Sequence, residues 1–326
     1  MKKNIAIVTG GNSSESVISL QSASTIKEVL NDEKYNAWVV NITGNDWEVC
    51  FNESCNLIIN KDDFSFTHEG EKTNFDCALM SIHGTPGEDG KLQAYFDLVN
   101  IPHTTCNVLA ASITFNKFAS KTYLKNFGID MANSIMIRKG QKIKPEDIIS
   151  ITGLPCFVKP NEGGSSFGTS KVKYKADLKN AIISAFKEDA DEVIIEEFIG
   201  GTEITCGLVK TKEDEYIFPV TEIVSKTEFF DYDAKYTPEL VEEITPARIP
   251  DNIAEKCQES SSFIYDILNC HGLIRVDYIL KGDKLYFLEV NTVPGMSAAS
   301  IVPKQAEVFG LSLTELFDII LEDSMI

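Results

Sequence analysis

Four polar residues interrupt two apolar stretches near the C-terminal end of the chain. In segment 272–292, GLIRVDYILKGDKLYFLEVNT, Arg275 and Asp277 stand in the first stretch and Glu289 and Asn291 in the second. The Lys-Gly-Asp-Lys letters between the stretches are typical of a turn, so the segment predicts a β-hairpin. With a three-residue turn at 282–284, Asp277 lies directly opposite Glu289. All four side chains then project from one face, because side chains alternate along a strand.

Two facing carboxylates and a carboxamide on one surface favour a metal site. Facing Cβ atoms are about 4.5–5.5 Å apart, so the carboxylates repel each other unless a cation lies between them. Mg²⁺ prefers oxygen ligands and commonly completes its shell with water and phosphate. In the alternative interpretation, Glu289 pairs with Arg275 or Lys284 on an exposed face, and a two-residue turn would send the acids to opposite faces. The facing acid, the Glu-x-Asn spacing and the following Pro-Gly favour Asp277, Glu289 and Asn291 as metal ligands.

A loop rich in glycine and serine is the second candidate binding element. In CFVKPNEGGSSFGTSKV, Lys159 ends an apolar stretch and is followed by Gly163, Gly164, Ser165 and Ser166. Glycine lets backbone N–H groups approach an anion, and serine hydroxyls add donors, so the loop is a candidate phosphate cover. It matches neither the Walker A motif nor the dinucleotide fingerprint. Taken alone, such a segment is most often only a turn.

Two weaker signals accompany this loop. Lys117 lies on an expected helix, where a lysine is ordinarily a surface residue. The apolar stretch at 192–199, EVIIEEFI, predicts a strand whose edge could present backbone groups to a purine, although an ordinary core strand has the same pattern.

The elements that must position these residues follow in order along the chain. The first forty residues read strand, glycine-rich turn, helix, strand, which predicts a parallel βαβ unit. We expect strands at 75–84 and 101–105 with a helix at 90–100 between them, and therefore an open parallel α/β domain over residues 1–105. A helix at 116–128 and a β-turn-β-α-β pattern indicate an α+β unit over 106–203. The remainder, 204–326, contains strands, an irregular region at 225–248, a helix at 251–271, the hairpin and a terminal helix.

Length and composition restrict the class of protein. A chain of 326 residues with 43% hydrophobic residues is typical of a globular protein of two or three domains. A net charge of −19 argues against nucleic-acid and anionic-membrane partners, whose phosphates require basic patches. The N-terminus has no secretory pattern and no apolar run is long enough to span a membrane, so we expect a cytoplasmic protein. The eight cysteines are scattered and are expected to be reduced, packed thiols.

Taken together, the motifs resemble the D-alanine–D-alanine ligase family of the ATP-grasp superfamily. The matching strings occur in the family's order over nearly the whole chain: GGNSSESVISL, HGTPGEDGKLQ, FNKFASK, VKPNEGGSSFGTSKV, VIIEEFIGGTEIT, EFFDYDAKY, IRVDYIL and LEVNTVPGMSAASIVP. The resemblance implies a three-domain ATP-grasp architecture and a homodimer. It also implies ATP-dependent synthesis of D-alanyl-D-alanine for peptidoglycan through a D-alanyl phosphate.

The resemblance implies a nucleotide site between the central and C-terminal domains. Its metal ligands are the three derived above, holding Mg²⁺ or Mn²⁺, usually as two ions. The residues implied in ATP binding are Lys117, Lys159, Ser166, Glu196, Glu197, Phe198, Ile199, Glu203, Phe229 and Lys235.

The resemblance also implies where two D-alanine molecules bind. Glu15 would hold the ammonium group of the first D-alanine. Without the resemblance, its position indicates only an acid at a helix N-terminus. His83 would lie near the same substrate, although a lone loop histidine is usually just polar surface. Arg275 and the Gly295 N–H would stabilise the oxygen of a tetrahedral intermediate. Ser300 and Ile301 match positions that bind the carboxylate of the second substrate.

Segment 225–248 would act as a lid that excludes water from the acylphosphate. Tyr236 in this segment, with Glu203 and Ser165, matches a network that ties the lid to the glycine/serine loop. Because family members that make D-alanyl-D-lactate differ here, DAKY favours an amine as the nucleophile. Two departures stand out: Val17 replaces a usual glutamate near Glu15, and Phe230 replaces a common lid tyrosine.

Three other functions are weighed against this one. Another carboxylate–amine ligase of the superfamily would use the same acylphosphate with different amino acids. A regulator that binds nucleotide without catalysis would not need Arg275, Asp277, Glu289 and Asn291. A dinucleotide oxidoreductase, suggested by IVTGG, lacks G-x-G-x-x-G and leaves the C-terminal acids unexplained.

Overall fold

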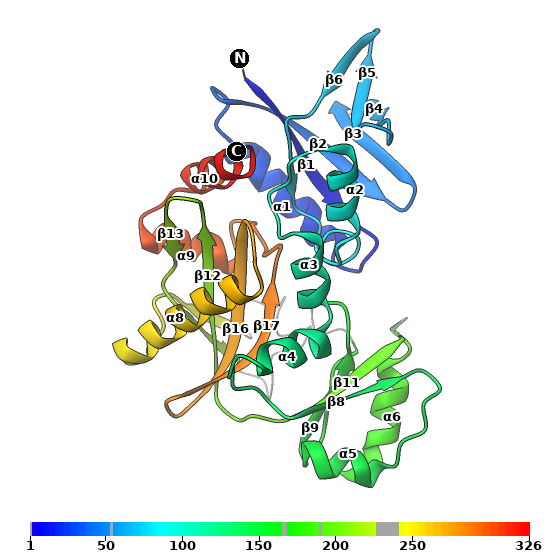
Figure 1. Ribbon diagram of the computed structural model, residues 1–326, viewed down its shortest axis with the longest axis vertical. Coiled ribbons are helices and arrows are strands. Elements are labelled where there is room, and N and C mark those ends of the chain that lie inside the picture. Colours follow the sequence, from blue (N-terminus) through cyan, green and yellow to red (C-terminus); the bar gives the residue numbers. More distant parts are fainter. Residues whose placement is uncertain (1, 53–54, 165–167, 189–190, 226–240) are drawn as a thin grey trace.

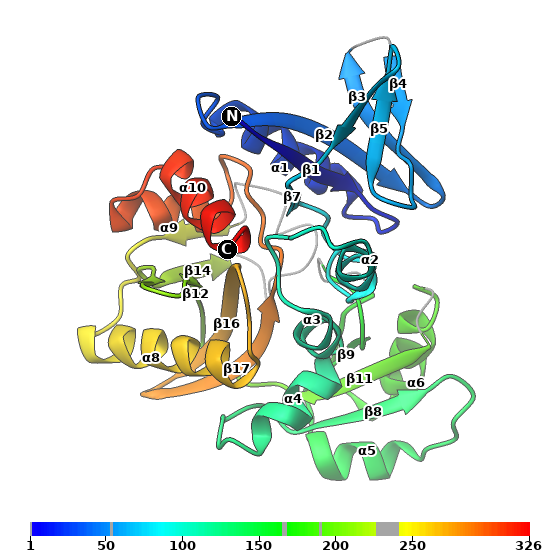
Figure 2. The same ribbon diagram turned by 45° about the horizontal axis from the view of Figure 1, so that its top comes forward.

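The computed structural model describes residues 2–52, 55–164, 168–188, 191–225 and 241–326. Within these ranges the strands form sheets of five, four and six strands and a separate two-stranded hairpin, with helices packed around them. Figure 1 shows the N-terminal sheet at the upper right, the C-terminal sheet below it on the left and the green central sheet at the lower right. Strands β16(Leu273–Lys281) and β17(Lys284–Asn291) form one edge of the C-terminal sheet, on the side where α3(Val108–Phe115) and α4(Lys117–Lys125) lie (Figure 2).

The N-terminal sheet is built around a buried parallel strand. Strand β1 is buried continuously from Ile5 to Gly10 because both of its faces are covered, which is typical of a parallel sheet. It pairs in parallel with both β2 and β7, which confirms the predicted βαβ unit. The order is β4(Cys55–Ile58), β3(Asp46–Asn52), β2(Tyr35–Thr43), β1(Lys3–Gly10) and β7(Cys77–Met80).

The sequence predicted an entirely parallel sheet, but this sheet is mixed. Strand β3 is antiparallel to β2 and β4 is antiparallel to β3, so the outer half of the sheet is a meander. The expected strand at 101–105 is reduced to a single bridge between Ala78 and His103. The other elements of this part are α1(Ser16–Val29), α2(Lys91–Val99) and the hairpin β5(Ser65–His68) with β6(Glu71–Asn74).

The central sheet is antiparallel and carries its helices on one face. Val193 and Ile195 of β11 belong to the cluster that the two helices cover, whereas Ile194 between them does not. This alternation is that of a sheet with one helix-covered face. The order is β10(Ser170–Val172), β9(Cys156–Pro160), β11(Glu192–Glu197) and β8(Ser134–Arg138), with helices α5(Pro145–Thr152) and α6(Lys175–Ala185).

The C-terminal sheet differs from expectation at three places. Strand β15 lies within the segment expected to be irregular, α8 ends at Ile267 rather than near 271, and the terminal helix is two helices. The strand order is β15(Val241–Ile244), β14(Thr221–Ser225), β12(Thr202–Lys210), β16(Leu273–Lys281) and β17(Lys284–Asn291), with β13(Glu215–Ile217) paired to β12. The helices are α3(Val108–Phe115), α4(Lys117–Lys125), α8(Asp251–Ile267), α9(Ile301–Phe309) and α10(Leu313–Ser324).

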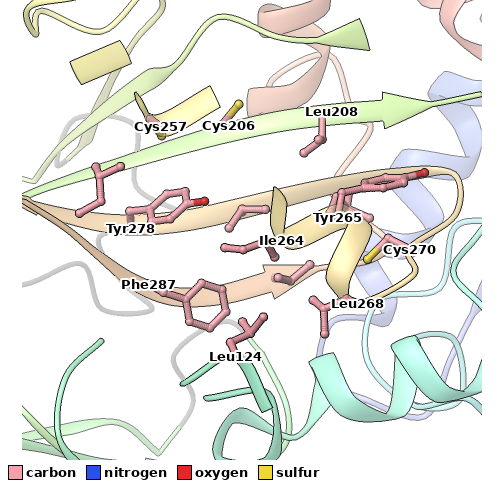
Figure 3. Packing of buried hydrophobic residues seen from close by; sticks show 14 of the residues in the cluster. Leu124, Cys206, Leu208, Cys257, Ile264, Tyr265, Leu268, Cys270, Tyr278 and Phe287 are labelled. Carbon is pink, nitrogen blue, oxygen red and sulfur yellow. The ribbon is translucent and has the colours of Figure 1, made fainter. Parts of the chain in front are cut away.

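A buried cluster fixes the two strands that carry the candidate metal ligands. Tyr278 of β16 and Phe287 of β17 are buried, with ring centroids 6.4 Å apart. Ile264 of α8 and Leu124 of α4 pack in the same cluster (Figure 3). Alternation directs Asp277, next to Tyr278, to the opposite face of β16, and Glu289 of β17 pairs with Asp277 there.

Two further expectations concern thiols and membranes. The cysteines whose side chains the structure describes are free, and all of them except Cys50 are buried, as predicted. None of the helices in the described ranges combines the length and the apolar character that crossing a membrane requires.

Candidate active site

The candidate metal ligands face one another on β16 and β17, but not through the turn that the sequence analysis assumed. Asp277 pairs with Glu289 and Arg275 with Asn291, as expected. The turn has two residues, because Lys281 pairs with Lys284. The register shifts by one between Asp277 and Tyr278, where Leu288 is the extra residue of a β-bulge. The bulge cancels the effect of the shorter turn and restores the acids to one face.

Asp277 is a buried carboxylate at the centre of a hydrogen-bond network. Arg275 donates from Nε to Oδ1 and from Nη2 to Oδ2, both at 2.8 Å. Asn291 Nδ2 donates to Oδ2 at 2.8 Å, and the hydroxyl of Thr205 donates to Oδ1. Burial acts to lower the pKa of Arg275, but Asp277 outweighs it and the pKa is raised, so the guanidinium is a permanent cation.

Glu289 and Asn291 leave oxygens free on the same surface. In the part of the chain that the structure describes, no hydrogen bond to the Glu289 carboxylate is formed, and Asn291 uses only its NH₂ group on Asp277. No group of three or more His, Cys, Asp and Glu side chains within the described ranges is arranged to hold a metal. The site offers two acids and one amide, so remaining ligands for a cation must come from water or substrate.

A second charged group lies between α4 and the central sheet. Glu196 is buried and forms ion pairs with Lys121 at 2.6 Å and with Lys159 at 2.5 Å. Burial acts to raise the pKa of Glu196, but the two lysines outweigh it and lower the pKa to about 2. Burial likewise acts to lower the pKa of Lys159, and Glu196 and Glu289 reverse this and raise it.

Lys117 is a buried cation that forms no ion pair with a carboxylate in the part of the chain that the structure describes. Its Nζ donates to the carbonyl oxygen of Gly163, in the glycine/serine loop. Its pKa is lowered mainly by burial; Glu289 opposes this effect and Lys159 reinforces it. A buried ammonium of this kind gains when an anion binds beside it, because the anion compensates the cost of burying the charge.

The expected purine-binding segment starts on β11 and continues past its end. Glu196 and Glu197 are the last two residues of β11, and Phe198 and Ile199 follow it. The ring of Phe198 lies 5.8 Å from that of Phe157, and Lys171 Nζ lies 3.8 Å from its centroid. This segment therefore ends in an aromatic surface that can accept a planar base.

Glu15 lies where the N-terminal part meets the glycine/serine loop. It is the N-cap residue of α1, so it does lie at a helix N-terminus as its local sequence suggests, but its side chain makes no capping hydrogen bond to the helix. A Cβ atom on Gly164 would lie 2.6 Å from Glu15 Oε2, so the loop approaches this carboxylate closely. The departure residue Val17 is 59% exposed on the same helix.

His83 and the segment after β17 are joined through one serine. Ser22 Oγ lies 3.3 Å from His83 Nε2 and accepts a hydrogen bond from the Met296 N–H at 3.2 Å. His83 is buried, so it is not the surface residue that a lone loop histidine usually is. Gly295 precedes Met296, and a Cβ atom on it would lie 2.9 Å from Ser300 Oγ.

The candidate residues among these groups line one cavity of about 1640 Å³. Every candidate site residue in the described ranges is among its lining residues: Glu15, His83, Lys117, Lys159, Glu196, Glu197, Phe198, Ile199, Glu203, Arg275, Asp277, Glu289, Asn291, Gly295, Ser300 and Ile301. The remaining candidates, Ser165, Ser166, Phe229, Lys235 and Tyr236, and the departure Phe230, lie outside the described residues. The cavity thus combines acids, buried cations and an aromatic surface.

Two family models match the chain. Residues 4–106 match the D-ala D-ala ligase N-terminus and residues 123–322 match the D-ala D-ala ligase C-terminus. The chain belongs to the D-alanine–D-alanine ligase family. This confirms the resemblance stated from the motifs, and with it the assignment of the chain as an enzyme.

Similar proteins span the full length of the chain. A curated D-alanine–D-alanine ligase of Phocaeicola vulgatus is 52% identical over 99% of both chains. The crystal structure of a D-Ala:D-Ser ligase from Enterococcus faecalis is 31% identical, with a TM-score of 0.87 over 99% of this chain and 100% of that one. A D-alanine–D-alanine ligase from Bacillus anthracis, solved in complex with ATP, is 31% identical, with a TM-score of 0.79 over 100% and 97%. The predicted fold class is therefore confirmed.

Lys121 in FNKFASK and Glu88 in HGTPGEDGKLQ are two titratable residues to which the sequence motifs gave no role. Lys121 lies four residues after Lys117 on α4, and this spacing places both on one face of the helix. Glu88 accepts hydrogen bonds from the N–H groups of Gly84 at 2.7 Å and Val293 at 3.3 Å, and so joins the loop after β7 to the segment after β17. Burial, followed by the charge of Glu15, raises the pKa of Glu88 to about 8.

Proposed function

We propose that the chain joins two molecules of D-alanine into D-alanyl-D-alanine, with ATP as co-substrate, and so supplies peptidoglycan synthesis. The observation that carries this proposal is the single cavity lined by every described candidate residue for both substrates, nucleotide and metal. Membership of the D-alanine–D-alanine ligase family supports the same activity. We retain the expected division into an N-terminal domain 1–105, a central domain 106–203 and a C-terminal domain 204–326 as part of the proposal.

The reaction divides into two transfers. A carboxylate oxygen of the first D-alanine attacks the γ-phosphorus of ATP, and ADP leaves. The amine of the second D-alanine then attacks the carbonyl carbon of the D-alanyl phosphate, and inorganic phosphate leaves as the peptide bond forms. Glu15 holds the ammonium of the first substrate, which lies between this carboxylate and His83. The close approach of Gly164 to Glu15 supports this position at the boundary with the phosphate-covering loop.

Negative charge on the tetrahedral intermediate requires fixed donors. Arg275 remains charged and its orientation is held by two hydrogen bonds to Asp277, which is the preorganisation that such stabilisation needs. The main-chain N–H of Gly295 provides a second donor in this proposal. Ser300 and Ile301, at the start of α9, bind the carboxylate of the second D-alanine.

The nucleotide binds between the central and C-terminal sheets. Lys117 and Lys159 bind its phosphates, together with Ser166 and Lys235, and Phe198 and its neighbours bind the base. The buried ammonium of Lys117 supports this role, because an anionic ligand would compensate its charge. Glu203 binds the ribose in this proposal, and Phe229 contributes to the same site. Segment 225–248 closes over it, with Tyr236 and Ser165 joining the closed lid to the loop.

A divalent cation fits the residues at the hairpin. Asp277, Glu289 and the amide oxygen of Asn291 are hard donors on one face, as Mg²⁺ or Mn²⁺ prefers. When bound, the cations, two in this proposal, supply charge neutralisation on the phosphates. Glu289, which lacks a hydrogen bond from any described residue, has the carboxylate best able to join such a shell.

The decisive experiment uses the purified chain with ATP and Mg²⁺. We expect ADP release only when D-alanine is supplied, and we expect mass spectrometry to detect D-alanyl-D-alanine. L-alanine serves as the negative control. D-serine is added as a competitor to test how strictly the second substrate site selects D-alanine. ADP release with L-amino acids but not with D-alanine would assign the chain to another carboxylate–amine ligase activity. Nucleotide binding without ADP release under any of these conditions would favour the regulator.

We further propose that the enzyme is a homodimer that acts in the cytoplasm, with no nucleic-acid or membrane partner. Its net charge of −19 supports the absence of a polyanionic partner. Sedimentation velocity at several protein concentrations tests the dimer, and a single monomeric boundary throughout would contradict it.

A further inference from the structure

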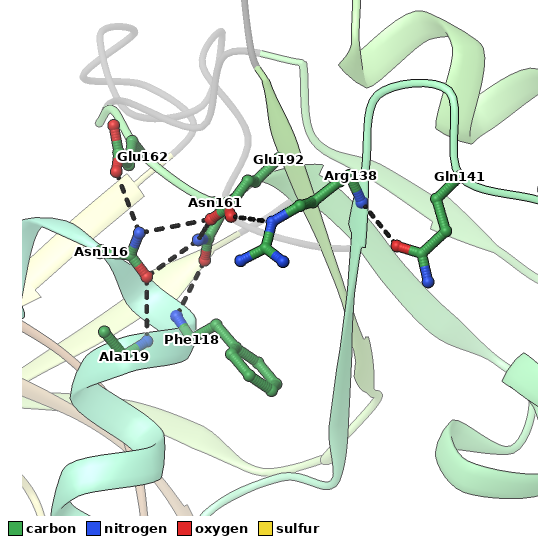
Figure 4. Close-up of polar contacts among 8 residues, drawn as sticks. All are labelled: Asn116, Phe118, Ala119, Arg138, Gln141, Asn161, Glu162 and Glu192. Atoms are coloured by element: carbon green, nitrogen blue, oxygen red, sulfur yellow. Dashed lines mark hydrogen bonds and ion pairs between the residues drawn. The ribbon is translucent and has the colours of Figure 1, made fainter.

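The two described phosphate-binding candidates come from different elements, and one side chain joins those elements. Lys117 is the first residue of α4, whereas Lys159 lies on β9 of the central sheet. Asn161 follows Lys159 by two residues and is fully buried. Figure 4 shows its side chain between the N-terminus of α4 and Glu192.

We propose that Asn161, together with Asn116, is a positioning residue that fixes Lys117 relative to Lys159 for binding of the nucleotide phosphates. This inference deepens the proposed function and rests on the assignment of both lysines to the phosphates. It gives a specific role to two amides that the sequence motifs left without one.

Asn161 caps α4 from outside the helix. The N–H of Lys117 donates to the backbone oxygen of Asn161 at 3.0 Å, and the N–H of Phe118 donates to its Oδ1 at 2.8 Å. The side chain of Asn116 accepts from the Ala119 N–H at 2.9 Å. The first N–H groups of a helix lack partners within the helix, so these acceptors determine where α4 begins. Lys117 is placed by the same bonds because it is the first residue of the helix.

The NH₂ group of Asn161 ties this cap to the sheet. It donates to Asn116 Oδ1 at 2.9 Å and to Glu192 Oε2 at 2.8 Å. The backbone N–H of Asn161 donates to the backbone carbonyl oxygen of Glu192 at 3.0 Å. Glu192 is held in turn by Arg138 Nε at 3.0 Å. Asn161 therefore uses its amide both as an acceptor and as a double donor. An aspartate at this position would retain the acceptor but could not donate, and its carboxylate would repel that of Glu192.

The network continues into the glycine/serine loop. Asn116 Nδ2 donates to Glu162 Oε1 at 2.9 Å, and Lys117 Nζ donates to the Gly163 oxygen. Asn116, Lys117, Glu162 and Gly163 all line the cavity. The burial that lowers the pKa of Lys117 makes its location sensitive, because a displaced ammonium would lose its compensating groups.

The test compares Asn161→Asp and Asn161→Ala with the wild type. Removing the donors shifts α4 relative to β9, so we expect the KM for ATP and the Kd for a β,γ-imido ATP analogue to rise about tenfold, as loss of hydrogen bonds worth about 1.4 kcal/mol implies. The Ki of adenosine, which has no phosphate, should stay within about twofold of the wild-type value. The same is expected of the KM for D-alanine.

A matched control separates positioning from a general loss of stability. Ser312→Ala removes the side-chain cap of α10, whose serine accepts from the Glu315 N–H at 3.2 Å, and Ser312 does not line the cavity. This variant should lose stability by about 1 kcal/mol, as the loss of a helix cap typically costs, and keep the wild-type KM for ATP. If Asn161→Ala does not fold, Asn161→Asp keeps the Phe118 cap and still tests the donors.

Three results would overturn the inference: an unchanged KM and Kd in a folded Asn161 variant, a parallel rise in the adenosine Ki, or an equal rise in Ser312→Ala. Failure of the proposed function has a different signature. In that case the wild type binds the imido analogue but forms no D-alanyl-D-alanine, and the Kd comparison still decides the role of Asn161.

Discussion

Asp277 lies directly opposite Glu289 because a bulge at Leu288 compensates for a turn that is one residue shorter than the register would otherwise require. The two deviations have opposite effects on the alternation of side chains, so together they keep both acids on the face that lines the cavity. The hydrogen bonds of the two acids differ. Asp277 is held by Arg275, Asn291 and Thr205, whereas Glu289 accepts no hydrogen bond from the described residues.

This difference predicts that Glu289→Gln affects turnover without affecting the fold. We expect turnover to fall by about 10²–10³-fold, because the lost carboxylate charge is needed where phosphate charge is neutralised. The free energy of unfolding should fall by no more than about 1 kcal/mol, since no hydrogen bond within the described part of the chain is lost and only the attraction of Glu289 to Lys117 and Lys159 is removed. Steady-state rates over a magnesium titration, with urea unfolding of the same samples, provide the measurement.

Glu307→Gln, an exposed change on α9, is the control and should leave both quantities unchanged. A near-normal rate for Glu289→Gln at low magnesium would refute the metal assignment.

The sequence predicted that Asp277 pairs with Glu289 in this hairpin, but it did not predict the two-residue turn and the bulge that produce this pairing. Hydrophobic alternation placed Asp277 and Glu289 on facing strands, yet a bulge leaves no composition signal of its own, so the turn length was wrong. Lys121 was missed because lysines are ordinarily exposed, and only the tertiary contact with Glu196 explains its burial. The role of Asn161 depends on contact with a helix 45 residues away in the chain, which a single sequence does not contain. The local sequence pattern thus identified the candidate metal ligands, whereas contacts between residues distant in the chain determine which charged side chains are buried.

The buried ion pairs of Glu196 predict a strong effect of Lys121→Met. Lys121 and Glu196 have side chains only 2% and 5% exposed, so removal of one lysine leaves buried charge less compensated. We expect the free energy of unfolding to fall by about 2–4 kcal/mol, measured by urea denaturation at pH 7. Lys175→Met removes an exposed pair with Glu146 and should cost no more than about 1 kcal/mol. Equal losses in the two variants would contradict the importance of the buried pair.

Glu88 predicts a specific pH dependence of stability. Its pKa is raised by burial, and then by Glu15, from 4.5 to about 8. Between these values the folded state keeps a proton that the unfolded state releases, so the unfolding free energy falls as pH rises from about 4.5 towards 8. Glu88→Gln removes this titration, and we expect a flatter curve and a relative gain in stability at high pH.

Urea unfolding of wild type and Glu88→Gln at pH 5, 6, 7 and 8 measures the difference directly, with these values chosen to span roughly the titration window. Parallel curves for the two proteins would show that Glu88 titrates at an ordinary pKa. Because Glu88 joins the Gly84 and Val293 segments, circular dichroism of the variant should accompany the series to confirm its native fold.

Gly164 predicts how closely the glycine/serine loop must approach Glu15. A methyl group at this position would lie 2.6 Å from Glu15 Oε2, which is closer than real Cβ contacts allow, and the flexible carboxylate would move away. If Glu15 holds the ammonium of the first D-alanine, Gly164→Ala weakens a charge-assisted hydrogen bond worth about 1.5–3 kcal/mol, or roughly 10- to 100-fold in KM for that substrate. Steady-state rates as a function of D-alanine concentration, fitted with two KM values, separate the first site from the second.

Gly200→Ala supplies the control for this change, because among the described residues its added methyl group would meet only the Phe198 ring, at an ordinary 3.6 Å. We expect the first KM to rise in Gly164→Ala and in Glu15→Gln but not in Gly200→Ala, since the first two act on the same carboxylate. The double variant should then be little worse than Glu15→Gln alone, because non-additivity is the signature of two changes on one interaction. Fully additive effects would mean that Gly164 acts on the loop itself, and that the Glu15 carboxylate does not bind the first substrate through this approach.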